Sequence, residues 1–239
     1  FRMGIAVSAK NFLPSNIQVL PSWFEIRVNK DGHLALAGRV DLMMAMNAES
    51  YRQYLDDVSP GGVFIYDDTW PRQAMLDRDD VTVIGVPLSG LCNEHFSGSR
   101  TRILMKNIAY LGVLIALLDI DREVVTALLH ETFASKSALI DANEKALSLG
   151  YDYAIEHFSC PLETRLERMN ATEGHVVIDG NTAAGLGCVY AGATVGAWYP
   201  ITPSTSLMDS YKSFGEQFRK DPQTGERRYL LVQAEDELA

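Results

Sequence analysis

Cysteine is scarce in this sequence, and the three residues that occur are poorly placed to act together. Cys92, Cys160 and Cys188 lie far apart, and no Cys-x-x-Cys pair is present. Such an odd, scattered set is typical of reduced thiols in the cytosol. Iron–sulfur clusters need about four thiolates brought together. We therefore expect no cluster on this chain, so any electron transfer through a cluster would require another polypeptide.

Positive charge is also in short supply. The 21 Lys and Arg residues are outnumbered by 31 Asp and Glu residues, which gives a net charge of −10. Because nucleic-acid binding requires clustered Lys and Arg, this balance argues against a nucleic-acid partner. The five histidines lie apart, without nearby Cys or carboxylate pairing, at His33, His95, His130, His157 and His175. We expect no metal site on this chain.

Long apolar runs and a leader sequence are missing. The best membrane candidate, residues 107–118, is short for a bilayer and is followed at once by Asp119 and Asp121. The N-terminal residues lack the basic region, apolar core and cleavage site of a signal peptide. We therefore expect a cytoplasmic protein that has no membrane partner.

Strands that alternate with helices are the main pattern in the N-terminal part. Residues 24–28 alternate in polarity and predict a strand, with a turn at residues 29–32 leading into a hairpin partner. Gly61 and Gly62 break the chain before another apolar segment, and a helix through Tyr54 precedes them. Further strands are expected at residues 40–46, 63–66 and 81–86. This alternation predicts an open α/β sheet.

Helices are expected from residue 103 onward. Residues 103–134 show helical spacing of apolar side chains, with Asp121 capping a second helix. Residues 137–158 predict a third helix, interrupted near Gly150. After a polar connection, residues 175–178 begin a new strand. We expect one α/β domain at residues 1–162, a linker at 163–174 and a second domain at 175–239.

Residues 199–205 read Tyr-Pro-Ile-Thr-Pro-Ser-Thr and form the most informative motif. Each proline fixes its own φ and favours extended backbone before it, so Tyr199 and Thr202 are expected in a stiff segment. Ser204 or Thr205 can then cap the following helix. A rigid hydroxyl beside a helix N-terminus suits an anionic carbonyl substrate. The alternative is a proline-rich turn with an ordinary cap.

Residues 227–232 predict a strand, and Glu235 lies at its C-terminal end. Ligand sites in open α/β sheets lie at the carboxyl ends of strands, so Glu235 is suitably placed for chemistry. The alternative is that Glu235 and its acidic neighbours occupy the first turn of a helix, where the helix dipole favours them.

An ordered series of motifs resembles a known family. The series comprises residues 179–187 (Asp-Gly-Asn-Thr-Ala-Ala-Gly-Leu-Gly), 190–193 (Tyr-Ala-Gly-Ala), 199–205 and 233–235 (Gln-Ala-Glu). It resembles the start of the α part of 2-oxoacid:ferredoxin oxidoreductases of the 2-oxoglutarate type. The N-terminal unit resembles the γ domain that many of these enzymes fuse ahead of the α part. Against the family pattern, the glycine-rich N-terminal opening and most of the pyrimidine-type thiamine domain are absent, as in a fragment.

The resemblance implies an activity and its cofactors. Family members oxidise a 2-oxoacid to acyl-coenzyme A and carbon dioxide and pass electrons to ferredoxin, with thiamine diphosphate shared between subunits. A β subunit would carry the diphosphate–Mg²⁺ site and the iron–sulfur cluster. We expect a hetero-oligomer that acts on 2-oxoglutarate and coenzyme A. This chain would be inactive without the β subunit and the missing α residues.

The resemblance also implies roles for individual residues. Glu235 would lie against N1′ of the thiamine aminopyrimidine, in a dry pocket that raises its pKa. Thr202 would lie over the reactive carbon and donate to the 2-oxoacid. The substrate would be bound by residues of the proline motif, namely Tyr199, Pro200, Ile201, Thr202, Pro203 and Ser204.

Two other functions stay open. The chain could be a non-catalytic assembly module that only docks against partner subunits. It could also be a nucleotide-binding α/β protein, although no glycine-rich phosphate loop lies at a strand-to-helix turn. Gly185-Leu186-Gly187 is expected inside a helix that packs close to its neighbour. The polar loop at residues 93–102 is either an ordinary surface loop or a contact for an anionic ligand such as coenzyme A.

Overall fold

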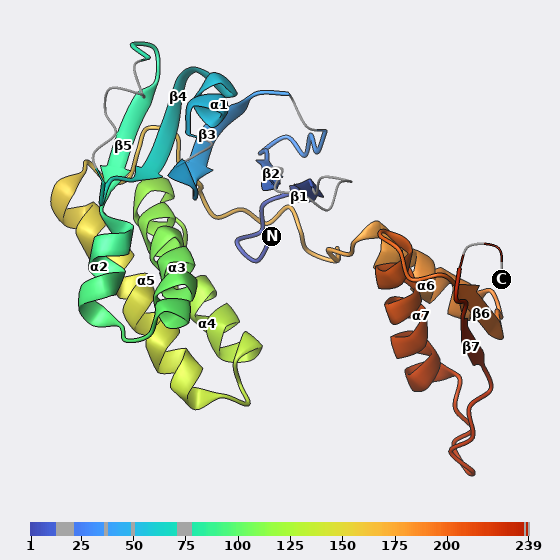
Figure 1. Ribbon diagram of the computed structural model, residues 1–239. Helices are drawn as coiled ribbons and strands as arrows, with labels where there is room; N and C mark the ends of the chain where they lie inside the picture. The colour runs from blue at the N-terminus through green and yellow to red at the C-terminus, as the bar shows by residue number, and fades with distance from the viewer. Residues whose placement is uncertain (13–21, 36–37, 49–50, 71–77, 237, 239) are drawn as a thin grey trace. The chain divides into compact units, whose positions relative to one another are not determined.

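The chain divides into two compact units, Phe1–Glu173 and Gly174–Ala239 (Figure 1). The computed structural model describes residues 1–12, 22–35, 38–48, 51–70, 78–236 and 238.

A three-stranded parallel sheet forms the frame of the first unit. It contains β3 (Val40–Ala45), β4 (Val58–Asp67) and β5 (Thr82–Val86) in that order. The helix α1 (Tyr51–Asp56) connects β3 to β4. The central strand carries fully buried Phe64 and Ile65, as expected where helices cover a parallel sheet. The predicted α/β class and these three strands are confirmed, although β4 runs through the glycine pair that was expected to precede it.

The predicted hairpin is wrong in its direction. The strand β2 (Trp23–Val28) pairs antiparallel with β1 (Val7–Phe12), which precedes it, rather than with a strand after the turn. The turn itself forms, because the Asn29 side chain accepts hydrogen bonds from the backbone of Asp31 and His33. After the turn, the chain crosses back and Leu34 accepts a hydrogen bond from the Ser8 hydroxyl of β1.

Four helices follow this sheet in the chain, and all but the third of them share a core with it. They are α2 (Leu88–His95), α3 (Ser99–Leu118), α4 (Arg122–Thr132) and α5 (Ser137–His157). The predicted cap of α4 is confirmed, since the Asp121 side chain accepts hydrogen bonds from the backbone of Glu123 and Val124. By length and composition alone, α3 is long and apolar enough to cross a membrane. The apolar run considered in the sequence, residues 107–118, is only part of this helix and is too short to span a bilayer. The helix contributes four fully buried side chains to the core: Ala109, Tyr110, Val113 and Leu117.

Helices α3 and α5 lie in close contact, which explains a second wrong prediction. Gly150 was expected to interrupt α5, but the helix is continuous. A Cβ atom at Gly150 would lie 1.9 Å from the carbonyl oxygen of Ala109 on α3, and one at Gly112 would lie 2.1 Å from the carbonyl of Leu147. Glycine at both positions therefore allows the two backbones to approach directly.

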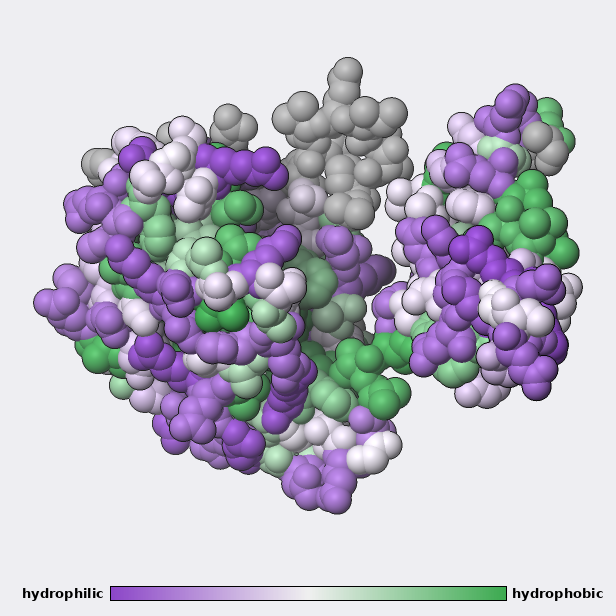
Figure 2. All heavy atoms as spheres, turned by 90° about the horizontal axis from the view of Figure 1, so that it is seen from below, coloured by the Kyte–Doolittle hydropathy of each residue, from purple (hydrophilic) through white to green (hydrophobic). Residues whose placement is uncertain are grey.

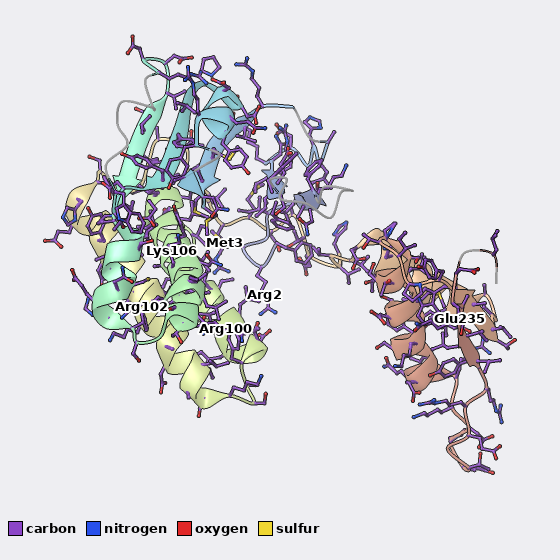
Figure 3. The ribbon with its side chains drawn as sticks, in the orientation of Figure 1. Arg2, Met3, Arg100, Arg102, Lys106 and Glu235 are labelled. Carbon is purple, nitrogen blue, oxygen red and sulfur yellow. The ribbon has the colours of Figure 1, made fainter. Side chains whose placement is uncertain are left out.

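The polar segment after α5 contains no helix or strand, but it is attached to the first unit. The backbone amides of Met169 and Ala171 donate to the carbonyls of Met3 and Gly4, at 2.8 Å each. The side chain of Arg2 extends from the same N-terminal stretch to Glu131 on α4, with a shortest N–O distance of 2.6 Å (Figure 3). The polar segment up to Glu173 therefore belongs to the first unit.

The second unit is a small α/β layer. It consists of α6 (Gly180–Tyr190), β6 (Val195–Trp198), α7 (Ser204–Phe218) and β7 (Leu230–Gln233). The strands β6 and β7 are parallel, and their inner face packs on α7 (Figure 1). The core contains Val189, Met208, Tyr211 and Tyr229. The strand predicted at residues 175–178 is wrong, because this segment forms no ladder among the described residues and its three apolar side chains are exposed.

Close packing also explains one glycine of α6, Gly185. A Cβ atom at Gly185 would lie 2.8 Å from both the Ser210 Cβ atom and the Tyr211 amide nitrogen of α7. The interpretation of this Ala/Gly-rich segment as a packing helix is therefore supported by the geometry. On the face drawn in Figure 2, hydrophilic residues dominate the surface of each unit, and smaller hydrophobic patches interrupt them.

Gly150→Ala is expected to lower the free energy of unfolding by about 1–3 kcal/mol, because the added methyl group forces α3 and α5 apart. Gly187→Ala is the matched control, since a Cβ atom there would meet nothing within 4 Å. The control should be neutral or stabilising by up to about 1 kcal/mol. Urea unfolding of the two variants provides the measurement, and equal stabilities would contradict the close contact.

Candidate functional site

The candidate site lies where β6 and β7 end. Trp198 pairs with Gln233 at the last position of the parallel ladder. The Ala234 amide then donates to the Trp198 carbonyl at 2.9 Å, which continues the pairing by one step. Because the strands are parallel, the chain segments after Trp198 and after Gln233 leave the same edge of the sheet. One of these segments carries the proline motif, and the other carries Glu235.

Side-chain hydrogen bonds fix the loop that contains Thr202. The Ser204 hydroxyl group is placed to donate to the carbonyls of Tyr199, at 3.0 Å, and Ile201, at 2.6 Å. The Ser204 amide also donates to the Ile201 carbonyl at 2.8 Å. The prediction that Ser204 or Thr205 caps α7 is wrong, because Pro203 holds the cap position and no side chain caps the helix. Ser204 is the first helical residue, so its hydroxyl group reaches back to the loop.

The loop exposes its hydroxyl-bearing residue. Thr202 is exposed, as are Pro200, Ile201 and Pro203, whereas Tyr199 and Ser204 are half-buried. Among the described residues, the Thr202 hydroxyl group makes no hydrogen bond. A donor of this kind on a fixed loop is available to an incoming carboxylate or carbonyl oxygen.

Glu235 lies two residues beyond β7 and is exposed (Figure 3). The described residues of this unit therefore do not form the dry pocket that was expected around its carboxyl group. Ala234, Glu235 and Asp236 are not helical, so the alternative of a helical first turn gains no support from this segment. The acidic neighbour Glu237 lies outside the described residues.

Glu216 on α7 binds residues that lie just before β7. Sequence reasoning did not identify this residue. Glu216 accepts a hydrogen bond from the Tyr229 hydroxyl group at 2.7 Å and pairs with Lys220 and with Arg227. The hydrogen bond from Lys220 is the largest influence, and together with that from Tyr229 it lowers the pKa of Glu216 to about 2. The only available signal was the spacing of Glu216 and Lys220, four residues apart on a helix.

The first unit has a cavity at the carboxyl ends of β3 and β4. Its volume is about 410 Å³, and it is lined by Met46, Asn47, Ala48, Tyr51, Asp67, Trp70 and Lys106. Lys106 reaches it from α3, with its ammonium nitrogen 3.5 Å from the Asp67 carboxylate (Figure 3). Open α/β sheets bind ligands at this edge, and Lys106 offers a cation to an anionic group there. Sequence reasoning did not single out these residues.

The Asp67 carboxylate in the cavity wall is held in place by several hydrogen bonds. The Thr69 hydroxyl group donates to its carboxylate at 2.6 Å, and the Ser89 hydroxyl and amide groups donate as well. Burial raises the pKa of Asp67, but the hydrogen bonds from Ser89 and Thr69 outweigh burial and hold it below its ordinary value. Asp67 therefore stays charged at neutral pH and ties the end of β4 to the start of α2.

The polar loop after α2 is partly structural. Arg102 donates from Nε to the Phe96 carbonyl at 2.8 Å, which closes the turn between α2 and α3, while Arg100 is exposed (Figure 3). Within the described residues, no group of three or more His, Cys, Asp or Glu side chains could hold a metal ion. The three cysteines are free.

Comparison with known proteins decides the family. The sequence model of the pyruvate ferredoxin/flavodoxin oxidoreductase family matches residues 1–153. The chain belongs to this family. Among its relatives is subunit alpha of 2-oxoacid:ferredoxin oxidoreductase 2 from Aeropyrum pernix, which is 25% identical over 99% of this chain and 44% of its own length. Ketoisovalerate oxidoreductase subunit VorA from Methanothermobacter thermautotrophicus is 31% identical over 49% of this chain and 23% of its own length.

A solved structure shares the fold of this chain. The 2-oxoglutarate:ferredoxin oxidoreductase from Magnetococcus marinus, with 2-oxoglutarate, coenzyme A and succinyl-CoA bound, matches with a TM-score of 0.77. It is 26% identical in sequence, and the match covers 99% of this chain and 39% of that one. The chain therefore spans less than half the length of this structure and of the Aeropyrum relative.

Glu216 should make stability depend on pH in acid solution. Because its pKa in the folded state, about 2, lies below the ordinary value of 4.5, its contribution is complete above about pH 4.5 and is lost as the pH falls toward 2. Wild type should therefore lose stability more steeply over this range than Glu216→Gln, by urea unfolding at each pH. Glu226→Gln, which changes an exposed carboxylate, should follow wild type. Parallel curves for Glu216→Gln and wild type would exclude this contribution.

Proposed function

We propose that this protein is a subunit of a thiamine-diphosphate-dependent 2-oxoacid:ferredoxin oxidoreductase. One observation supports it most: the loop with Thr202 and the segment with Glu235 leave the same edge of the β6–β7 ladder. A hydroxyl donor and a carboxylate are thereby placed at the edge where α/β sheets bind ligands. Family membership and the alpha-subunit relatives agree with this proposal.

The residues present have the chemistry that the cofactor requires. Thiamine diphosphate, when bound, supplies a carbon nucleophile that attacks the 2-oxoacid carbonyl. Glu235 would exchange a proton with N1′ of the aminopyrimidine. The Thr202 hydroxyl group would donate to the carboxylate or carbonyl oxygen of the substrate. Tyr199, Pro200, Ile201, Pro203 and Ser204 would shape the loop around it. Because Glu235 is exposed in this unit, neighbouring protein would have to exclude water from its carboxyl group.

We assign the remaining components to partners. Since the described residues offer no metal-binding group, a β subunit would hold Mg²⁺ with the cofactor diphosphate and carry the iron–sulfur cluster. The first unit would be the γ-type domain, and the second would be the start of the α-type domain. Coenzyme A and ferredoxin would complete the reaction in a cytoplasmic hetero-oligomer.

For the substrate we propose 2-oxoglutarate. The matched structure from Magnetococcus marinus contains 2-oxoglutarate, and 2-oxoglutarate oxidoreductase subunit KorA from Mycobacterium tuberculosis is 25% identical over 91% of this chain and 35% of its own length. The ketoisovalerate relative represents the competing choice. The test is coenzyme-A-dependent viologen reduction by the full-length subunit assembled with its partners, using a panel of 2-oxoacids. Absence of turnover with every 2-oxoacid would favour the non-catalytic assembly module.

Thr202→Val should lower kcat/KM for the 2-oxoacid in the assembled enzyme while leaving thiamine diphosphate affinity unchanged. The change is nearly isosteric but removes a donor, and a hydrogen bond to a charged group contributes roughly 1.5–3 kcal/mol, or about 10- to 150-fold. Thr224→Val, on an exposed turn of the same unit, is the control. An unchanged kcat/KM would reduce Thr202 to a turn residue.

Glu235→Gln should suppress proton exchange at C2 of the bound thiamine by roughly 10²- to 10⁴-fold, the usual contribution of one general acid–base group. The amide keeps the size of the carboxyl group but cannot exchange a proton with N1′. Glu226→Gln is the control, because Glu226 is exposed on the same unit. Proton–deuterium exchange in the assembled enzyme gives the measurement, and equal rates in Glu235→Gln and wild type would remove Glu235 from the mechanism.

A further inference from the structure

Among the described residues, Asn181 is the one outside residues 199–206 whose side chain donates a hydrogen bond to the loop that carries Thr202. The Asn181 side-chain amide, in the first turn of α6, donates to the Pro203 carbonyl at 3.0 Å and to the Ser206 hydroxyl at 2.7 Å. The contact therefore joins α6 to the loop and to the first turn of α7. In the described part of the chain, the other side-chain hydrogen bonds to loop carbonyls come from Ser204 and Ser206, which follow the loop in sequence.

These contacts fix the backbone on both sides of Thr202. Ser204 holds the Ile201 carbonyl before it, and Asn181 and Ser206 hold the Pro203 carbonyl after it. Pro200 and Pro203 have no N–H group, so the loop has few backbone donors with which to fix itself. Apart from the hydrogen bond of the Ser204 amide to the Ile201 carbonyl, the described hydrogen bonds to its carbonyl groups come from side chains, and among them Asn181 provides the link to α6.

Asn181 is itself held rigidly. The Asp179 side chain caps α6 by accepting a hydrogen bond from the Thr182 amide at 2.9 Å, which orders the turn that contains Asn181. Further along, Gly185 lets α6 contact α7 directly. The position of the Pro203 carbonyl is therefore set by the packing of two helices rather than by the loop sequence.

We propose that Asn181 is a positioning residue for the reaction of the 2-oxoacid. Its amide fixes the Pro203 carbonyl and thereby the direction in which the adjacent Thr202 hydroxyl group donates to the substrate. The inference rests on the proposed function, because it acts through Thr202. A donor displaced by about 1 Å loses much of its contribution to the reaction, which gives the hydrogen bond a role beyond stability.

Asn181→Leu removes the amide while keeping its approximate size and adding no charge. In the assembled full-length enzyme, kcat/KM for 2-oxoglutarate should fall by roughly 3- to 100-fold. Proton exchange at C2 of the bound thiamine should stay at the wild-type rate, because Glu235 lies on a different segment. Gln217→Leu is the matched control: it removes an exposed amide from α7 of the same unit and should leave kcat/KM unchanged.

The double variant Asn181→Leu/Thr202→Val separates positioning from a purely structural role. If Asn181 acts through Thr202, the double variant should be no slower than Thr202→Val alone. Multiplied losses, or a normal kcat/KM in Asn181→Leu while Thr202→Val is impaired, would overturn the inference and leave the proposed function intact. A normal kcat/KM in Thr202→Val would overturn the inference together with the role of Thr202, whereas absence of turnover with every 2-oxoacid would count against the proposed function itself. Should Asn181→Leu fail to assemble, Ser206→Ala removes the other Pro203 donor and should show the same lack of additivity.

Discussion

The parallel pairing of β6 with β7 is the constraint on which the candidate site depends. The two strands are short, and their pairing is continued beyond the ladder by the hydrogen bond from the Ala234 amide to the Trp198 carbonyl. This register brings the end of β6 beside the end of β7 although more than thirty residues separate them in the sequence. A shift by one residue would exchange the inner and outer faces of β7 and move Glu235 relative to the proline loop.

The second unit maintains this register through contacts on one side of the sheet. Gly196 lies against Met208 and Tyr211 of α7, and Tyr229 joins the same core just before β7. The Glu216 carboxylate then fixes the hydroxyl end of Tyr229, so the start of β7 is held by packing and by a charge-assisted hydrogen bond. The loop after β6 is held separately by Ser204 and Asn181. Geometry at the site is thus set by α6 and α7, whose backbones meet at Gly185.

The first unit follows the same rule with different residues. Its central helix α3 contacts α5 through Gly112 and Gly150, and this contact supports the helix from which Lys106 reaches the sheet edge. Asp67 ends the central strand, and its carboxylate accepts hydrogen bonds from the Thr69 hydroxyl and the Ser89 amide. These bonds fix the wall of the cavity at the end of β4. In both units, therefore, polar side chains at the carboxyl ends of parallel strands depend on close helix packing.

The sequence by itself determined the α/β class, most strands and helices of the first unit, the cap at Asp121 and the two segments that meet at the candidate site. These features are local, because they follow from polarity periods, prolines and capping residues within a few positions. The tertiary structure decided which strands pair, where helices continue and which distant side chains come into contact. It pairs β2 with the strand before it, forms no strand at residues 175–178, continues α5 through Gly150 and turns the Ser204 hydroxyl group back to the loop. It also gives contacts to Asn181 and Glu216 that the sequence did not predict, although Asn181 lies within the motif at residues 179–187. Partner choice between strands and close contact between helices depend on residues distant in the chain, and for that physical reason only the folded molecule shows them.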